Sequence, residues 1–249
     1  MLLTRVTSLL FDAVLSLTHP QTCAICKSSV ESRSHGVVCE QCWGQTDIFG
    51  PDQLLCWKCG VPSAGIVAPE DLTAVRCGRC DEQVFTAARA CGIYAGALRE
   101  TVLALKRQPY LPEHLLRELE MVCGREPLSA GTRVVPVPLH PVRQRKRGFN
   151  QAVIIARALS QLLSLPLDEV SLVRTRQAEK YRAGLDAKGR AETVVQAFEV
   201  CYPQLIGGEN ILLVDDVFTT GATASACGKA LLRAGAAKVF VVTIARPAW

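Results

Sequence analysis

The stretch that decides the fold comprises residues 211–223, Ile-Leu-Leu-Val-Asp-Asp-Val-Phe-Thr-Thr-Gly-Ala-Thr. Its first four residues form an apolar run, which is typical of a strand covered on both faces. Two adjacent carboxylates follow, then a short loop with hydroxyl groups and one glycine, and the amphipathic segment 225–233 predicts a helix directly afterwards. The stretch therefore predicts one strand–loop–helix unit of an α/β fold.

The loop of this unit suits an anion. Backbone N–H groups at the start of a helix are unpaired and carry the positive end of its dipole. Gly221 lets the backbone approach a ligand, and the loop threonines add donors, while Asp215 and Asp216 can accept hydrogen bonds from vicinal ribose hydroxyls. A sugar phosphate is the favoured ligand. The alternative is a polar turn that only caps a helix, and neither common glycine-rich nucleotide-binding motif is present.

The rest of residues 90–249 also follows an α/β pattern. Expected helices cover 96–107, 112–124, 150–163 (with Asn150 as N-cap) and 223–234, and expected strands cover 133–137, 197–200, 210–214 and 238–245. We therefore expect a mostly parallel sheet flanked by helices. Ligands bind at the carboxyl ends of such strands, where the two aspartates are expected to lie.

A basic run follows the expected strand 133–137. It contains Arg143, Arg145, Lys146 and Arg147. Because the carboxyl ends of parallel strands meet at one edge, this run is expected to face the same crevice as the anion loop, where it would bind a pyrophosphate group or a DNA backbone. A solvated loop is the alternative.

Eight of the twelve cysteines form four Cys-x-x-Cys pairs. Two such pairs complete one tetrahedral Cys₄ site, so the count predicts two structural zinc ions. Sequential pairing would join Cys23, Cys26, Cys39 and Cys42 in one site and Cys56, Cys59, Cys77 and Cys80 in the other. A cross-braced pairing stays open.

Other uses of these cysteines fit less well. A disulfide framework is typical of secreted chains, and no signal peptide is evident here. An iron–sulfur cluster also takes four thiolates, but Cys-x-x-Cys knuckles at these separations favour zinc. A redox motif needs one pair at a helix N-terminus rather than four pairs in loops.

Charge separates the two parts of the chain. Residues 1–92 carry 7 Lys/Arg and 9 Asp/Glu, whereas residues 93–249 carry 21 Lys/Arg and 14 Asp/Glu. Any nucleic-acid contact is therefore expected in the second part, and zinc is expected to be structural. The apolar segment 6–17 is too short to span a membrane, so residues 1–22 are expected to form an amphipathic helix.

The stretch 211–223 resembles the phosphoribosyl-pyrophosphate (PRPP) loop of type I phosphoribosyltransferases. By this resemblance Asp215 and Asp216 hold the ribose and its Mg²⁺, and the residues that hold the 5′-phosphate are Thr219, Thr220, Gly221, Ala222 and Thr223.

More of the chain is similar to the ComF/GntX family. The resemblance rests on the Cys-x-x-Cys array, Pro-Val-Pro-Leu at 136–139, Arg-Lys-Arg-Gly-Phe-Asn-Gln at 145–151 and the stretch above. It implies an N-terminal helix (1–22), a zinc-ribbon-like double zinc-finger module (23–89) and a type I phosphoribosyltransferase-like domain (90–249). It also implies a mobile loop, which here carries Arg176, Lys180, Arg182 and Arg190.

The same resemblance implies a role in natural competence and DNA uptake. A cytoplasmic protein of this family would bind PRPP with Mg²⁺ and handle single-stranded DNA, beside a DNA-translocating helicase or a membrane uptake machinery. Association with the membrane stays open. The alternatives are an active phosphoribosyltransferase of nucleobase or amine metabolism, and a scaffold that docks to such partners.

Overall fold

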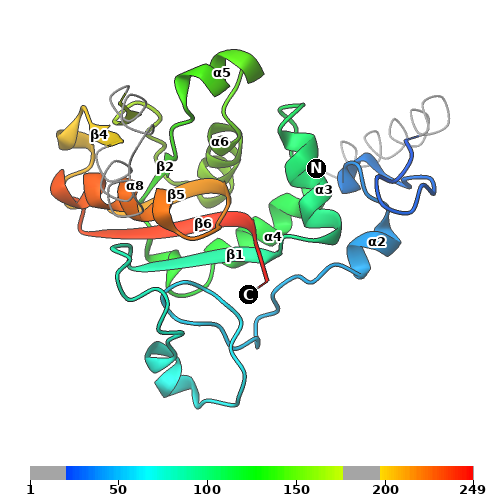
Figure 1. The fold of residues 1–249 in the computed structure, drawn as a ribbon, viewed down its shortest axis with the longest axis horizontal. Coiled ribbons are helices and arrows are strands. Elements are labelled where there is room, and N and C mark those ends of the chain that lie inside the picture. Colours follow the sequence, from blue (N-terminus) through cyan, green and yellow to red (C-terminus); the bar gives the residue numbers. More distant parts are fainter. Residues whose placement is uncertain (1–20, 176–196, 249) are drawn as a thin grey trace, which may run out of the picture.

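The computed structural model describes residues 21–175 and 197–248 (Figure 1). Most of the predicted helix at 1–22 and all four basic residues of the predicted mobile loop lie outside these ranges. The elements are η1 Arg33–His35, α2 Glu40–Gly44, η2 Pro69–Ala74, β1 Ala87–Ile93, α3 Gly96–Leu105, α4 Glu113–Cys123, η3 Leu128–Ala130, β2 Arg133–Pro136, α5 Pro141–Arg147, α6 Gln151–Leu163, β3 Leu172–Arg174, β4 Phe198–Val200, η5 Pro203–Leu205, β5 Asn210–Val217, α8 Ala222–Arg233 and β6 Lys238–Arg246.

A parallel sheet organises the molecule. Four strands lie in the order β1-β6-β5-β2, and every pair in it is parallel. The separate β3 and β4 form a two-stranded antiparallel pair. The predicted fold class, a mostly parallel sheet flanked by helices, is therefore confirmed. Since β5 is a central strand, its carboxyl end lies between neighbouring strands, where side chains from several elements can converge.

The apolar run of β5 is buried on both faces. Ile211 and Leu213 belong to one core, while Leu212 and Val214 belong to the other, as alternation along a strand requires. Helices α3, α4 and α6 cover the face of Leu212 and Val214, and α8 covers the opposite face together with β3 and β4 (Figure 1). Burial on both faces explains why this run lacks the alternation of a half-exposed strand.

The two cysteine modules join different cores. The first contributes Val38 and Trp43 to the core of α3, α4 and α6, and the Trp43 ring lies 4.4 Å from that of His114 on α4. The second contributes Cys56 and Cys59 to the core on the α8 side. Each module therefore stabilises, and depends on, a different face of the sheet.

Strand β3 has no counterpart in the sequence-based expectation, and three further elements differ from it. The edge strand β1 was not predicted, because its Ala-rich sequence has little strand propensity, and it spans the domain boundary drawn at residue 90. The basic run forms a helix, α5, which His140 caps through Nδ1 and which ends at Gly148 with φ of 80°. Finally, β5 continues to Val217 and so includes both aspartates.

Candidate functional site

The two aspartates lie in the last residues of β5. Asp215 pairs in register with Thr243 of β6, and Phe218 N–H still donates to the Ala245 carbonyl at 2.9 Å. The Asp216 N–H donates to Oδ1 of Asp215 at 2.9 Å. Both carboxylates are half-buried. The sheet therefore fixes their backbone. By the alternation along the strand, Asp215 faces the α8 side, while Asp216 faces Lys106 on the α3 side.

Electrostatics at this edge favours a positively charged or hydroxyl-bearing ligand. Burial, together with the charge of Asp216, raises the pKa of Asp215 to about 7. Lys106, directly after α3, partly offsets this because its Nζ lies 3.6 Å from Oδ2 of Asp216. Lys106 was not among the predicted site residues, because it is far from the aspartates along the chain. The pair thus carries excess negative charge that a bound cation would compensate.

The loop after β5 turns sharply into α8. Gly221 has φ of 77°, and a Cβ there would lie 2.8 Å from Cζ of Phe218, so glycine is required. Ala222 opens the helix, and its N–H is 3.4 Å from Oγ1 of Thr220. A small hollow of about 20 Å³ brings together Asp215, Thr219, Gly221, Thr223 and Thr243. The predicted loop residues therefore converge at one helix N-terminus, together with the unpredicted Thr243.

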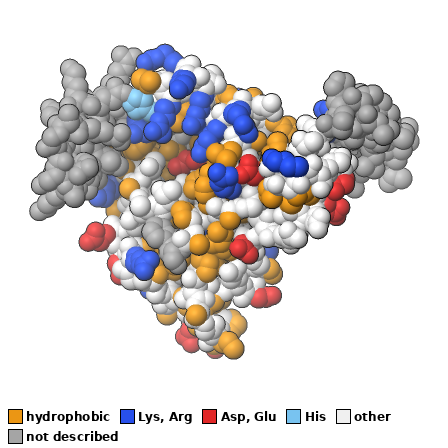
Figure 2. All heavy atoms as spheres, turned by 45° about the vertical axis from the view of Figure 1, so that its right-hand side comes forward, with side chains coloured by type: hydrophobic (Ala, Val, Ile, Leu, Met, Phe, Trp, Pro, Cys, Tyr) orange, Lys and Arg blue, Asp and Glu red, His pale blue; other side chains and the backbone are white. Residues whose placement is uncertain are grey.

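Helix α5 rises from the same edge of the sheet. β2 pairs with β5, and the Val137 N–H donates to the Val214 carbonyl at 2.8 Å, so α5 begins beside the aspartates' strand. Lys and Arg side chains gather along the upper part of the face in Figure 2. On α5, Arg143, Arg145 and Lys146 are exposed, and Arg147 donates to Oε1 of Gln151 at 2.7 Å.

The helical form of this run divides its charges. At about 100° per residue, Arg143, Lys146 and Arg147 share one side of α5, and Arg145 lies on the other. One bound anion can therefore contact three of the four at once. The role of these residues stays a prediction.

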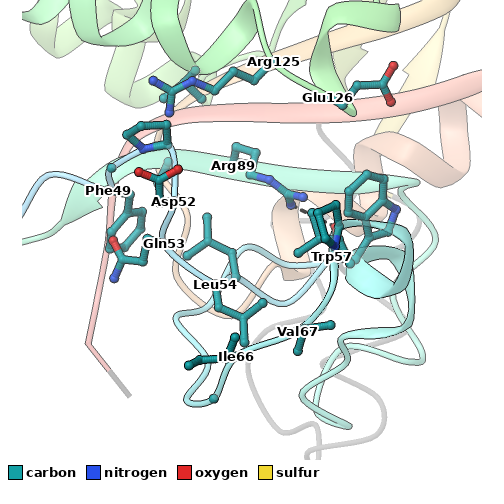
Figure 3. A pocket seen from close by; sticks show the side chains of 18 residues that line it. Phe49, Asp52, Gln53, Leu54, Trp57, Ile66, Val67, Arg89, Arg125 and Glu126 are labelled. Atoms are coloured by element: carbon teal, nitrogen blue, oxygen red, sulfur yellow. Dashed lines mark hydrogen bonds between the residues drawn. The ribbon is translucent and has the colours of Figure 1, made fainter.

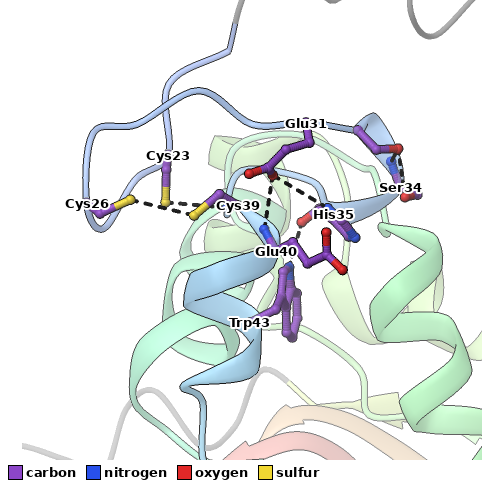
Figure 4. A network of polar contacts seen from close by, with 9 residues as sticks. Cys23, Cys26, Glu31, Ser34, His35, Cys39, Glu40 and Trp43 are labelled. Atoms are coloured by element: carbon purple, nitrogen blue, oxygen red, sulfur yellow. Dashed lines mark hydrogen bonds and ion pairs between the residues drawn. The ribbon is translucent and has the colours of Figure 1, made fainter.

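The eight paired cysteines form two clusters. Cys23, Cys26, Cys39 and Cys42 make one, and Cys56, Cys59, Cys77 and Cys80 make the other, with the four Sγ atoms of each within 4.8 Å of one another. This is the sequential pairing. Figure 4 shows Cys23, Cys26 and Cys39 turned toward each other.

The sulfur geometry fits a tetrahedral metal. The Sγ atoms of Cys26 and Cys39 lie 3.6 Å apart in the first cluster, and Sγ–Sγ distances in the second cluster are 3.5 to 3.7 Å. Thiolates bound to one tetrahedral zinc at about 2.3 Å lie about 3.8 Å apart. Burial opposes ionisation, but backbone N–H donors outweigh it and lower the pKa of Cys23 to about 6 and that of Cys56 to about 7. Burial and the neighbouring thiols raise the pKa of Cys42 and of Cys80, so a bound cation is needed to hold all four thiolates of a cluster. Each cluster can therefore hold a zinc ion.

The second cluster is hydrogen-bonded to the sheet. The Arg246 Nη1, at the end of β6, donates to the Cys59 carbonyl at 2.5 Å, and the Arg89 Nη1, on β1, donates to the Trp57 carbonyl at 2.9 Å. Burial lowers the pKa of Arg89 to about 10, so it stays protonated at neutral pH. These arginines were not predicted, because only the fold brings them to the cysteine knuckles.

Within the described ranges, no helix combines the length and apolarity that crossing a membrane requires.

No protein-family model matches the chain. Individual proteins are nevertheless similar to the chain in sequence. The chain is 32% identical over 238 residues to the DNA utilization protein YhgH of Escherichia coli (strain K12), a match that covers 92% of this chain and 99% of that protein. The chain belongs to the ComF/GntX family.

Further ComF relatives carry competence names. Competence protein ComFC of Bacillus subtilis (strain 168) is 25% identical over 254 residues, with 92% of this chain and 96% of that protein covered. Competence protein F of Haemophilus influenzae is 34% identical over 114 residues, a match that covers 45% of this chain and 49% of that protein.

Solved structures resemble this ComF chain only in part. The glutamine PRPP amidotransferase of B. subtilis matches at a TM-score of 0.37 and 19% identity over 52% of this chain and 25% of its own. A phosphoribosylpyrophosphate synthetase from Mycobacterium smegmatis matches at a TM-score of 0.32 and 16% identity. This match covers 51% of this chain and 33% of that protein. Likeness at this level carries no functional argument.

Proposed function

We propose that this ComF-family protein binds PRPP with Mg²⁺ at the carboxyl end of β5 and acts in natural competence by handling single-stranded DNA. The observation that carries the proposal is the convergence of Asp215 with the threonine–glycine loop at the N-terminus of α8, with Asp216 as the next residue of β5. This arrangement offers acceptors for sugar hydroxyls beside donors for a phosphate.

In this proposal each part of the ligand has its own protein group. The aspartates accept hydrogen bonds from the ribose 2′- and 3′-hydroxyls, and the backbone N–H groups of 219–223 hold the 5′-phosphate. The basic side of α5 neutralises the pyrophosphate. Mg²⁺ prefers carboxylate and phosphate oxygens, so the aspartate pair suits it, and it would neutralise charge on the bound pyrophosphate.

The DNA role rests on different support. Relatives of this chain are named for DNA utilization and competence, and the basic charge lies after residue 92. We assign DNA contact to the proposed domain at 90–249, through α5. Residues 23–89 are proposed to be a double zinc module whose two ions are structural, because each cluster is built into a core of the sheet.

Isothermal titration with PRPP and Mg²⁺ tests the ligand. In Asp215→Asn/Asp216→Asn each position loses charge-assisted hydrogen bonds worth about 1.5–3 kcal/mol, so PRPP binding weakens by more than about a hundredfold. The matched control is Asp52→Asn/Asp71→Asn, which removes two exposed carboxylates elsewhere. Equal affinity in the two double variants would mean that the loop only caps a helix.

One observation favours a second candidate, an active phosphoribosyltransferase. With a pKa of about 7, Asp215 can accept a proton at neutral pH. A nitrogen nucleophile would form a bond to the ribose C1 while the bond from C1 to pyrophosphate breaks, and its proton would pass to a carboxylate or to water. Pyrophosphate release across candidate nucleobases and amines separates this enzyme from a binding protein.

A further inference from the structure

Arg246 lies between the second cysteine cluster and the loop after β5. It is the last residue of β6, and its side chain is 2% exposed. Its Nη1 donates to the Cys59 carbonyl at 2.5 Å, and its guanidinium lies 5.6 Å from the ring centre of Phe218. A buried guanidinium is costly unless acceptors and negative charge lie close to it. One buried cation therefore contacts both a carbonyl of the cysteine cluster and an aromatic ring of the loop.

Phe218 carries this contact on to the start of α8. Its ring is buried and packs edge-on against that of Phe85, with 5.7 Å between the ring centres. Its Cζ lies 2.8 Å from where a Cβ on Gly221 would be, so the ring rests on the glycine backbone. Gly221 is the N-cap of α8, and its carbonyl accepts from Ser225 N–H at 2.7 Å. The ring position of Phe218 therefore sets where the turn, with its helix-start N–H groups, lies.

The segment after the last cysteine of the cluster makes a second contact with the same turn. Gln83 N–H donates to the Cys80 carbonyl at 3.1 Å, and Oε1 of Gln83 lies 3.2 Å from the same Cβ position on Gly221. The adjoining Val84 N–H donates to Oγ of Ser225 on α8 at 3.1 Å. These contacts connect the cysteine cluster to the first turn of α8 directly.

A cavity of about 430 Å³ lies between the second cysteine cluster and the loop. Cysteines of the cluster line one side of it, and Phe218 and Thr220 line the other. Arg246 and Gln83 also line it, and each contacts both sides. Because the cavity takes the place of direct packing there, the position of the loop depends on these two bridging side chains.

We propose that Arg246 is a positioning residue, which couples the second zinc site to the proposed phosphate loop through Phe218. The inference deepens the proposed function and rests on it, because the ligand of that loop is the proposed sugar phosphate. Zinc held by the four thiolates fixes the Cys59 carbonyl, and the guanidinium and the ring keep their places with it. Without zinc the carbonyl moves, and the Gly221 turn loses its support. The first cluster joins the core on the opposite face of the sheet, so the coupling belongs to the second cluster.

Arg89 on β1 makes the matching contact on the other side of the same module. Its Nη1 donates to the Trp57 carbonyl at 2.9 Å, and its guanidinium lies 5.5 Å from the Trp57 ring centre (Figure 3). It borders a different cavity, of about 420 Å³, whose described lining includes Leu54 and Val67 but no residue of the loop after β5. Arg246→Met and Arg89→Met therefore remove the same kind of anchor, and only Arg246→Met removes a contact with Phe218.

Hydrogen exchange of the zinc-loaded, full-length protein tests the coupling without any ligand. We expect the amides of 218–228 to exchange at least about fivefold faster in Arg246→Met than in the wild type, and at the wild-type rate in Arg89→Met. Arg246→Lys keeps a donor for the Cys59 carbonyl but not the flat guanidinium, so its rate should lie between those of the wild type and Arg246→Met. Thermal unfolding of both methionine variants shows whether their overall stabilities match.

Calorimetric titration with PRPP and Mg²⁺ then tests the consequence for binding. Arg246→Met should weaken PRPP binding by at least about fivefold, and Arg89→Met should leave it unchanged. Cys77→Ser removes one ligand of the second zinc and should weaken PRPP binding in the same way. The double variant Arg246→Met/Cys77→Ser should bind no more weakly than the weaker of the two single variants, because both changes act through one contact.

The outcomes separate the two proposals. If PRPP does not bind to the wild type, the proposed function fails, and the exchange rates of 218–228 still decide the coupling. If these amides exchange alike in Arg246→Met and Arg89→Met, or if the losses in PRPP affinity from Arg246→Met and Cys77→Ser multiply, the coupling is wrong and the PRPP site stands.

Discussion

Replacing Asp215 with asparagine should stabilise the unliganded protein, and the gain should grow with pH. Burial raises the pKa of this carboxyl from 3.8 to about 7 in the folded state, so the folded protein holds a proton that the unfolded chain releases between these values. The wild type therefore loses stability as pH rises through that window. Below the unfolded pKa the carboxyl is neutral in both states and contributes nothing.

The size of the effect follows from the shift. About three pKa units at about 1.4 kcal/mol each give an upper limit of about 4 kcal/mol above pH 7. Between pH 5 and pH 8 the wild-type penalty grows by about 2.6 kcal/mol, and solvent screening at a partly exposed side chain reduces this to about 1–1.5 kcal/mol. Asparagine has the same shape as aspartate but cannot ionise, so the Asp215→Asn variant lacks the whole pH-dependent stability penalty of this carboxyl.

Urea unfolding followed by circular dichroism at pH 5 and pH 8 measures this difference, with zinc present and PRPP absent. The cysteines are the same in both proteins, so their own pH dependence cancels in the comparison. Asp52→Asn, at an exposed position, is the control and should show no such growth. A stability difference for Asp215→Asn that is equal at both pH values, or a loss of stability at pH 8, would refute the reasoning.

The remaining predictions concern charge and metal. Lys106→Met should move the pH midpoint of this effect upward, because removing the nearby positive charge raises the pKa of Asp215 further; a downward shift in the same titration would contradict it. Metal analysis should find two zinc ions per chain, and Cys23→Ser should lose one without weakening PRPP binding, since the first module packs on the face away from α8; an iron–sulfur absorption band would overturn this assignment. Alanine at all four basic residues of α5 should lower the salt slope of single-stranded DNA binding by about 3, at about 0.7 per lost phosphate contact. Among the four single alanine variants, Arg145→Ala should lower this slope least, because Arg145 lies on the other side of α5. An unchanged slope in the fourfold variant would exclude α5 from the DNA contact.

Residues 211–223 carried most of what could be predicted. Their apolar run is long and contiguous, and the loop after it has a composition that few other local structures share, so both the strand and the helix start were found. The Asn150 cap of α6 was found for the same reason, since its side chain accepts from Ala152 N–H two residues later. Such signals are local, and local geometry is encoded in adjacent residues.

The missed elements had weak local signals. Strand β1 is rich in alanine and forms because β6 offers an edge to pair with. Helix α5 is dominated by like charges, which oppose helix formation at close spacing, and it depends on His140 and Gly148 at its ends. In both cases the flanking structure outweighs the propensity of the segment itself.

The sequence by itself determined the ligand types: eight thiolates in four knuckles, two carboxylates after an apolar run, and a loop able to bind an anion. These depend on residue identity and short spacing, which tertiary structure does not alter. Only the tertiary structure decided that the cysteine pairs join sequentially, that Lys106 meets Asp216, and that Arg246 and Gln83 bring the second cysteine module against the phosphate loop. Such contacts join residues far apart in the chain, and parallel strand pairing sets their positions, so no local pattern could reveal them.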